Sequence, residues 1–354
     1  MTGPALRIAL VAPARYPIRE PFTGGLEAFC HTLTVALRSL GHSVDLYAAR
    51  GSHGNEPSFE LPAVHWGRDQ YWASDTGYPP GAKEREDAAY AALREHLAQR
   101  DYDVVHNNSL NPGLLLPGGA PLPLVTTFHT PQLPEMQAAI DAAGSQAGRF
   151  AAVSRSTAAE WDTPGPIHVI PNGVDTHAWR PGCGGGPAIW FGRLVPEKAP
   201  HLALDACHAA GVPVVVAGRN GDRHYFDTMV APRLKAYNAT FVGELEHLRL
   251  HRLVASCSVC VVTPQWDEPF GLVAFEAMAC GTPVAAFDRG GLGELLRDAP
   301  VSLATSGNVD ALAGAIRIAA RIDRHHVAAW VRANFSLHAT ATRYIQLYRE
   351  VKVQ

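Results

Sequence analysis

The chain has 354 residues, 47% of them hydrophobic and 18% charged, with a formal net charge of −3, so it is long enough for two globular domains. No apolar run approaches the roughly 18 residues of a membrane-spanning helix, and residues 7–13 are too short for a signal peptide. Acidic side chains outnumber basic ones up to His168, and the reverse holds after it. Nucleic acid is therefore disfavoured as a partner, and any membrane contact would be weak and peripheral.

The six cysteines are scattered along the chain. Cys257 and Cys260 have CxxC spacing, but the second pair that a zinc site needs is absent. We expect Cys257 at a helix end and Cys260 in a buried strand. All six are expected to be reduced thiols in a cytoplasmic protein.

Apolar strand patterns and helical patterns alternate along the chain, which predicts parallel sheets covered by helices. In the first half, strands are expected at residues 7–13, 44–48, 104–107, 124–127, 150–153 and 167–170. Helices are expected from residue 24 to about residue 40, at 83–100, at 132–143 and after Ser154.

Two features of the first half are candidate ligand contacts. Gly24 and Gly25 open a helix after a loop, where a phosphate could approach the backbone, although a plain turn is an alternative. The GxGxxG fingerprint is missing after the first strand, which disfavours a nicotinamide cofactor. His129 follows a strand end, and a lone histidine is more often structural than functional.

The segment of residues 49–82 has little periodicity and contains Trp66, Tyr71, Trp72 and Tyr78. Loops of this length are more often functional than idle. The aromatic rings could stack on a sugar, and they could equally form a packed hairpin.

The second half repeats the alternation. Strands are expected at residues 188–192, 214–218, 258–262 and 284–287, with a further strand and turn at 240–245. Helices are expected after Lys198 and at residues 226–237, 248–256, 271–279, 309–322 and 339–351.

Arg193 and Lys198 bracket a turn at the carboxyl end of an expected strand. A guanidinium and an ammonium group both suit phosphate oxygens, and a surface ion pair is the alternative.

Two carboxylates flank the start of an apolar helix. Glu268 follows a buried strand, and Glu276 is the only charged residue between Gly271 and Phe287. A carboxylate inside such a helix is costly unless a ligand or partner binds it. The backbone N–H groups of residues 270–272 begin the helix and are free to bind oxygen atoms.

Glu268, the Pro269-Phe270-Gly271 turn and Glu276 resemble the paired-glutamate signature of retaining, nucleotide-sugar-dependent glycosyltransferases of family four. The resemblance covers nearly the whole chain and implies an α/β protein of the GT-B fold, with two Rossmann-like parallel-sheet domains facing a central cleft. The implied domains are residues 1–170 for the acceptor, residues 171–335 for the nucleotide sugar, and a C-terminal helix at 336–354 that packs back on the first domain.

The resemblance also assigns roles to residues. Glu268 and His129 would contact the donor sugar, Arg193 and Lys198 would bind the diphosphate, and Glu276 would hold the ribose. The other residues implied in donor binding are Gly24, Gly25, Gly192, Gly243, Leu245, Phe270, Gly271 and Leu272.

The implied reaction moves a hexosyl group from a nucleoside diphosphate sugar, with UDP favoured, to a hydroxyl acceptor. It would proceed with retention by a front-face mechanism, without a metal or a cofactor. A sugar, a small glycosylated metabolite and a lipid carrier all fit as acceptors. The alternatives are a nucleotide-sugar 2-epimerase, a phosphorylase with a pyridoxal cofactor, and a non-catalytic sugar-nucleotide-binding protein.

Overall fold

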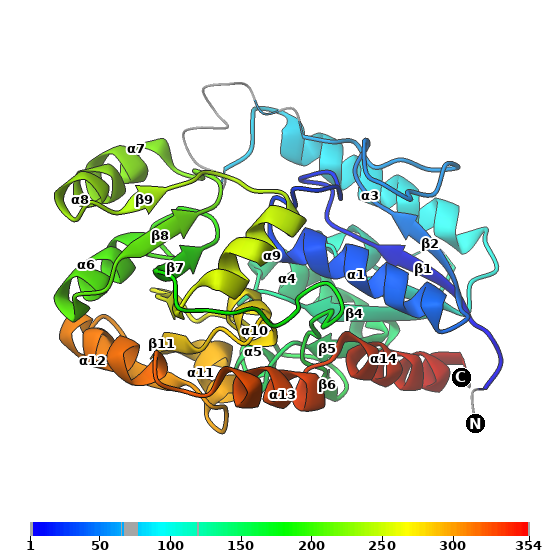
Figure 1. Cartoon of the computed structure of the whole chain (residues 1–354). Coiled ribbons are helices and arrows are strands. Elements are labelled where there is room, and N and C mark those ends of the chain that lie inside the picture. Colours follow the sequence, from blue (N-terminus) through cyan, green and yellow to red (C-terminus); the bar gives the residue numbers. More distant parts are fainter. Residues whose placement is uncertain (1–2, 65, 67–76, 119, 353–354) are drawn as a thin grey trace. The chain divides into compact units, whose positions relative to one another are not determined.

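The computed structural model describes residues 3–64, 66, 77–118 and 120–352. These residues form two compact units. The first unit contains the described residues up to 66, residues 78–173 and the C-terminal segment from residue 337, and the second contains Gly77 and residues 174–336. Each unit is an α/β structure built on a parallel sheet (Figure 1).

The sheet of the first unit has the strand order β2-β1-β3-β4-β5-β6, and every pair is parallel. Its strands are mostly buried, as expected for a sheet covered on both faces. Their bounds are β1 Arg7–Val11, β2 Ser43–Tyr47, β3 Val104–Asn107, β4 Leu124–Phe128, β5 Arg149–Ala152 and β6 Ile167–Val169.

The helices of the first unit follow the predicted alternation. Ser154 caps the short helix α5, since its side chain accepts a hydrogen bond from the Thr157 N–H. The bounds are α1 Gly25–Ser39, α3 Ala82–Ala98, α4 Pro134–Ala143, α5 Arg155–Ala158 and α14 Leu337–Lys352, with short 3₁₀ turns at Pro112–Leu114 and Gly144–Ala147.

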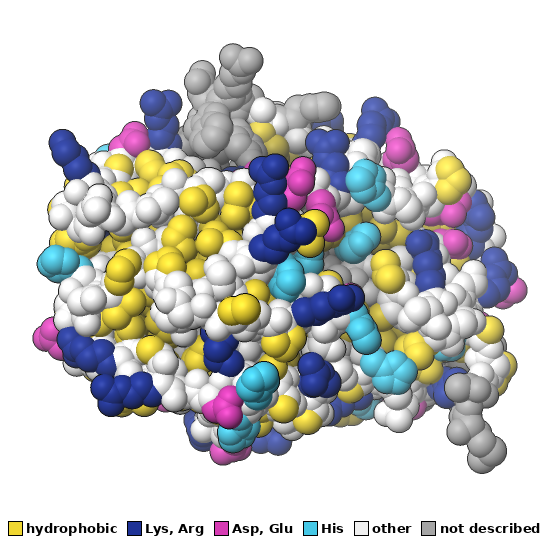
Figure 2. Space-filling view, viewed as in Figure 1, with side chains coloured by type: hydrophobic (Ala, Val, Ile, Leu, Met, Phe, Trp, Pro, Cys, Tyr) yellow, Lys and Arg dark blue, Asp and Glu magenta, His cyan; other side chains and the backbone are white. Residues whose placement is uncertain are grey.

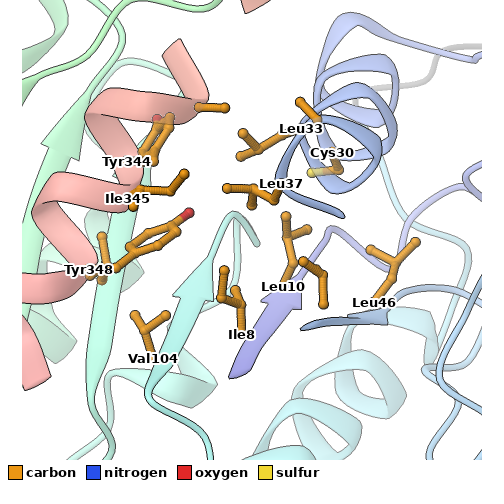
Figure 3. Close-up of a cluster of buried hydrophobic side chains, with 14 of the residues drawn as sticks. Ile8, Leu10, Cys30, Leu33, Leu37, Leu46, Val104, Tyr344, Ile345 and Tyr348 are labelled. Carbon is orange, nitrogen blue, oxygen red and sulfur yellow. The ribbon is translucent and has the colours of Figure 1, made fainter. Parts of the chain in front are cut away.

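The C-terminal helix α14 contributes to the core of the first unit, although it is distant in sequence. Figure 3 shows Tyr344, Ile345 and Tyr348 facing side chains of α1, β1 and β3, among them Leu37 and Val104. Each fully buried side chain of this size contributes about 1.5–3 kcal/mol by leaving water. The segment after residue 336 is therefore held by apolar packing on the first unit.

The sheet of the second unit has the order β12-β11-β10-β7-β8-β9, again parallel. Its strands are β7 Ala188–Phe191, β8 Val214–Ala217, β9 Thr240–Phe241, β10 Val259–Val262, β11 Val284–Asp288 and β12 Ser302–Thr305. Its helices are α6 Pro200–Ala210, α7 Arg223–Tyr225, α8 Ala231–Ala236, α9 His247–Ser256, α10 Leu272–Ala279, α11 Gly290–Leu296, α12 Val309–Ala319 and α13 Arg324–Asn334, with a π-helical turn at Phe226–Val230.

The expected helix at residues 226–237 is interrupted, which corrects the prediction. Its first part is the π-helical turn Phe226–Val230, and α8 begins only at Ala231. Pro232 has no N–H for an intrahelical bond, and its ring crowds the carbonyl four residues earlier. A wider turn before the proline relieves this conflict.

The cysteines lie where the sequence predicted. Cys257 ends α9, Cys260 lies in β10, and all six thiols are free. None of the helices in the described ranges combines the length and apolar character that crossing a bilayer requires.

The short edge strand β9 leaves apolar side chains in solvent. Phe241 and Val242 are 36% and 38% exposed, and Figure 2 shows hydrophobic atoms on the surface of this part of the second unit. The ring of Phe226 lies 5.2 Å from that of Phe241. An apolar surface therefore borders the segment at residues 240–245.

Candidate active site

Predicted site residues of the second unit follow neighbouring strands at one edge of the sheet. β10, β7 and β8 are adjacent and parallel, so their carboxyl ends lie together. Gly192 and Arg193 follow β7, and Glu268 follows β10. Open α/β sheets bind ligands at this edge.

A three-residue cluster of Lys198, Trp266 and Glu268 lies at this edge. Glu268 is 7% exposed, and its Oε2 forms an ion pair with the Lys198 ammonium. The Trp266 indole N–H donates to the same oxygen at 2.9 Å, and the Lys198 ammonium lies 5.0 Å from the centre of the indole ring. No described residue hydrogen-bonds to the other carboxylate oxygen, Oε1. The carboxylate is therefore anchored by one oxygen and offers the second to a ligand.

Backbone contacts tie together the two loops that carry this cluster. The Thr263 hydroxyl donates toward the carbonyls of Lys198 and Ala199, at 2.9 and 3.0 Å. The Gln265 N–H donates to the Glu197 carbonyl at 2.8 Å. The Lys198–Glu268 pair thus rests on adjacent strands whose following loops are fixed to each other.

Arg193 lies beside the same loops. Its guanidinium is 3.8 Å from the Glu197 carboxylate, and its side chain remains 30% exposed. The loop after β8 is bound to this segment, because the Leu194 N–H donates to the carbonyl of Arg219 at 2.9 Å. Arg219 is 6% exposed and brings a further cation to this edge.

The start of α10 offers backbone donors. Gly271 precedes the helix with a φ of 81°, a left-handed conformation that favours glycine. The N–H groups of Phe270, Gly271 and Leu272 make no hydrogen bond to another described residue. These groups and the positive end of the helix suit an oxygen-rich or anionic ligand.

The start of α11 contacts the backbone of Glu268. The Leu292 N–H donates to the Glu268 carbonyl at 3.1 Å. A Cβ atom on Gly290 would lie 2.7 Å from the backbone nitrogen of Glu268, so only glycine allows this approach. Gly290 therefore has a structural role in positioning Glu268.

Glu276 lies on α10 and is half-buried. Burial raises the pKa of its carboxyl group to about 8. No ion pair or hydrogen bond from a described side chain reaches this carboxyl group. An acid in this setting suits hydroxyl groups, with which it can exchange hydrogen bonds in either protonation state.

We expect the pH dependence of stability to change in Glu276→Gln. The raised pKa stabilises the folded state below the ordinary value of 4.5 for the carboxyl group, and this contribution is lost as the pH rises through about 8. The unfolding free energy of the native chain should therefore fall more than that of Glu276→Gln between about pH 6 and pH 9. Urea titrations of both proteins at these two pH values measure it. Parallel pH dependences would show that the pKa of Glu276 is not raised in the folded state.

Gly243 and Leu245 lie between β9 and α9. The carbonyl of Gly243 accepts a hydrogen bond from the Gly218 N–H at 2.8 Å, which ties this turn to the loop after β8. Leu245 is half-buried. The turn thus belongs to the same sheet edge as Gly192.

The first unit holds the remaining predicted residues. Gly24 and Gly25 begin α1, and His129 follows β4. The rings of Phe29, in the second turn of α1, and His129 lie 4.9 Å apart. The first unit thus brings the start of α1 near the end of β4.

The aromatic loop is described only in part, because Tyr71 and Trp72 lie outside the described residues. Trp66 and Tyr78 flank the Arg15 guanidinium, whose central carbon lies 4.8 and 4.6 Å from their ring centres. These two rings pack on a cation in the first unit.

One Asp-x-Asp triplet is present, Asp101-Tyr102-Asp103, and it precedes β3 at the amino-terminal end of the strand. Asp103 accepts a hydrogen bond from the Arg7 N–H at 2.8 Å, and the Tyr102 hydroxyl donates to Asp45 at 2.6 Å. No group of three or more possible metal ligands occurs among the described residues. These hydrogen bonds give the triplet a structural role.

Two residues of the candidate site were not predicted. Trp266 and Arg219 lie near predicted residues in the chain, but neither belongs to a motif. The signal that could have identified Trp266 is an aromatic residue two positions before Glu268, in a loop at the carboxyl end of a strand.

The chain is similar to known proteins along most of its length. The family model described as Glycosyltransferase Family 4 matches residues 23–178, and that described as Glycosyl transferases group 1 matches residues 188–330. Glycogen synthase of Mycobacterium tuberculosis (strain CDC 1551) is 27% identical over 405 residues, which cover 98% of this chain and 95% of that protein.

Two solved structures have the same fold. The glycosyltransferase AviGT4 of avilamycin A biosynthesis has a TM-score of 0.71 at 24% identity, with 98% of each chain covered. HepE from Anabaena, solved in complex with UDP-glucose, has a TM-score of 0.71 at 19% identity, with 98% of this chain and 100% of HepE covered.

The fold and the comparisons define a glycosyltransferase of the GT-B fold. More particularly, the chain belongs to glycosyltransferase family 4, which confirms the resemblance of its motifs.

Proposed function

We propose that this chain transfers a hexosyl group from a nucleoside diphosphate sugar to a hydroxyl acceptor, with retention at the anomeric carbon. The observation that carries the proposal is the Lys198–Glu268 ion pair at the carboxyl ends of β7 and β10. In this proposal the Lys198 ammonium binds the leaving diphosphate, and the free oxygen Oε1 of Glu268 binds sugar hydroxyls. UDP is the favoured nucleotide, and the complex of HepE with UDP-glucose supports this choice.

The proposed chemistry concentrates on the leaving group. Breaking the glycosidic bond places negative charge on the diphosphate, and preorganised cations and N–H groups stabilise such charge in the transition state. Arg193, Lys198 and the first amides of α10 supply these groups, with Gly192 leaving room at the backbone. The amides of Gly24 and Gly25 are proposed as further donors.

In this proposal the two carboxylates bind hydroxyl groups of the donor. Glu268 Oε1 binds the donor sugar, Glu276 binds the ribose, and the turn with Gly243 and Leu245 faces the nucleobase. Fixing the donor in this way aligns the anomeric carbon for attack. The acceptor enters from the face that the diphosphate leaves, and no residue is assigned as a covalent nucleophile.

Lys198 exchanges partners when the donor binds. Its ammonium pairs with Glu268 in the free protein, and a diphosphate carries more negative charge than one carboxylate. As Lys198 turns toward the diphosphate, the Trp266 indole N–H keeps its hydrogen bond to Glu268. Trp266 thus preserves the orientation of Glu268 during transfer.

We expect Trp266→Phe to lower kcat/KM by about 10-fold or more. The substitution keeps an aromatic ring and removes one hydrogen bond to a charged group, a bond that contributes about 1.5–3 kcal/mol. Isothermal titration with UDP should give nearly the native affinity, because the indole binds Glu268 and not the nucleotide. Unchanged kcat/KM for the sugar donor would show that Trp266 does not orient Glu268.

A direct test combines binding and turnover. A thermal-shift screen of UDP-, GDP- and ADP-sugars identifies the donor, since a ligand that binds the folded state raises its melting temperature. The selected donor is then incubated with a panel of sugar, metabolite and lipid-carrier acceptors, and NMR determines the anomeric configuration of the product. Transfer with retention and with full activity in EDTA supports the proposal. An inverted product, or epimerised sugar formed without acceptor, would contradict it.

A further inference from the structure

A buried amide contacts His129 in the first unit. Asn108 directly follows β3 and is fully buried, and its backbone N–H donates to the Val11 carbonyl at 2.8 Å. Its side-chain oxygen Oδ1 lies 2.9 Å from Nε2 of His129, and its nitrogen Nδ2 lies 3.4 Å from the carbonyl oxygen of His106. The backbone and both ends of the amide of Asn108 are therefore engaged.

These contacts fix which way the amide points. A backbone carbonyl can only accept hydrogen bonds, so the end of the amide beside His106 must be the NH₂ group. The opposite end, which faces His129, is then the carbonyl oxygen. Because this oxygen is only an acceptor, Nε2 of His129 must carry a hydrogen.

The consequence for His129 is a defined tautomer. Burial lowers the pKa of its imidazole to about 3, so the ring is neutral near pH 7. A neutral imidazole with a hydrogen on Nε2 has a lone pair on Nδ1. No described residue hydrogen-bonds to Nδ1, and Nδ1 is not among the buried side-chain atoms that lack a partner; His129 is partly exposed while Asn108 is not. The ring therefore presents an acceptor to solvent or ligand.

We propose that Asn108 is a positioning residue that holds His129 as its Nε2–H tautomer, so that Nδ1 accepts a hydrogen bond from a hydroxyl group of the sugar substrate. The functional part rests on the proposed glycosyl transfer. The tautomer also defines the ligand chemistry, because a lone pair attracts a hydroxyl hydrogen and repels a phosphate oxygen. His129 in this state has no hydrogen on Nδ1 to give to the leaving diphosphate.

The first test needs no ligand. The full chain is labelled with ¹⁵N-histidine, and a long-range ¹H–¹⁵N correlation spectrum near pH 7 distinguishes protonated from unprotonated ring nitrogens. The His129 signals are assigned by their loss in His129→Ala. We expect a protonated Nε2 and an unprotonated Nδ1. A hydrogen on Nδ1, or a mixture of tautomers, would overturn the inference.

The second test uses Asn108→Ala with a matched control. The control is Asn111→Ala, which removes another buried amide of the same loop, one that binds Asp87 and the Gly113 N–H. We expect Asn108→Ala to give a mixture of His129 tautomers and to lower kcat on the order of 10- to 100-fold, with a smaller change in donor KM. Asn111→Ala should leave the tautomer as in the native chain.

The outcomes separate this inference from the proposed function. A native Nε2–H tautomer without transfer to any acceptor would count against the proposed function alone. Equal tautomer mixtures in both variants, or native kcat in a folded Asn108→Ala protein, would count against the positioning role. If Asn108→Ala does not fold, Asn108→Ser is measured in its place, and the spectrum of the native chain still decides the tautomer.

Discussion

Glu268→Gln should lower kcat for glycosyl transfer by about 100- to 1,000-fold, while the affinity for UDP changes by only a few-fold. The substitution keeps the shape of a side chain that is 7% exposed, but it removes the charge that Lys198 and the Trp266 N–H bind through Oε2. In the variant the amide oxygen accepts from these two donors, and the NH₂ group takes the place of Oε1, so the acceptor offered to the donor sugar is replaced by a donor. The donor sugar then lacks its main carboxylate contact.

The matched control is Asp267→Asn, which changes the neighbouring carboxylate. The Asp267 side chain is 60% exposed and pairs with Arg289 at 3.1 Å, in a surface interaction that contributes little. Steady-state kinetics with saturating donor and isothermal titration with UDP provide the two readouts. A Glu268→Gln protein with more than a tenth of native kcat, or equal losses in both variants, would contradict the role of Glu268.

Much of the fold could be predicted because the apolar strand patterns are clear. The runs that became β7 and β10 are bounded by turn residues, and parallel sheets bury such strands on both faces. Two of the elements that were missed show where the patterns are weak. β12 at Ser302–Thr305 has only small and polar residues beside one leucine, and α13 at Arg324–Asn334 was not recognised although Asp323 caps it. The interruption of the expected helix at residues 226–237 by Pro232 was also overlooked.

The candidate site was predictable in its residues and not in its contacts. Lys198 was interpreted as a phosphate-binding cation, but the sequence could not show its pairing with Glu268. That pair depends on β7 lying beside β10, and this order is set by tertiary packing of strands distant in sequence. Trp266 and Asn108 were missed because each acts through another side chain and belongs to no motif.

Lys198→Ala should show the second large effect, in both activity and stability. In the proposed reaction Lys198 neutralises the leaving diphosphate, and loss of one such group costs about 100- to 1,000-fold in kcat. The substitution also leaves the Glu268 carboxylate without its cation. Breaking a fully buried pair costs about 3–5 kcal/mol. The Lys198 side chain is 25% exposed and that of Glu268 is 9% exposed, so we expect a smaller loss of about 1–3 kcal/mol in unfolding free energy.

A double-mutant cycle separates the two causes. In Lys198→Ala with Glu268→Gln, no uncompensated carboxylate remains, so the double variant should be more stable than Lys198→Ala alone although both are nearly inactive. Urea denaturation measures the stabilities, and kcat/KM with the identified donor measures activity. Lys198→Arg keeps the charge on a differently shaped group. We expect it to keep most of the native stability and to lose most of the native activity. Additive stability changes for Lys198 and Glu268 would show that the ion pair does not form in solution, and the basis for a preorganised donor site in the second unit would be removed.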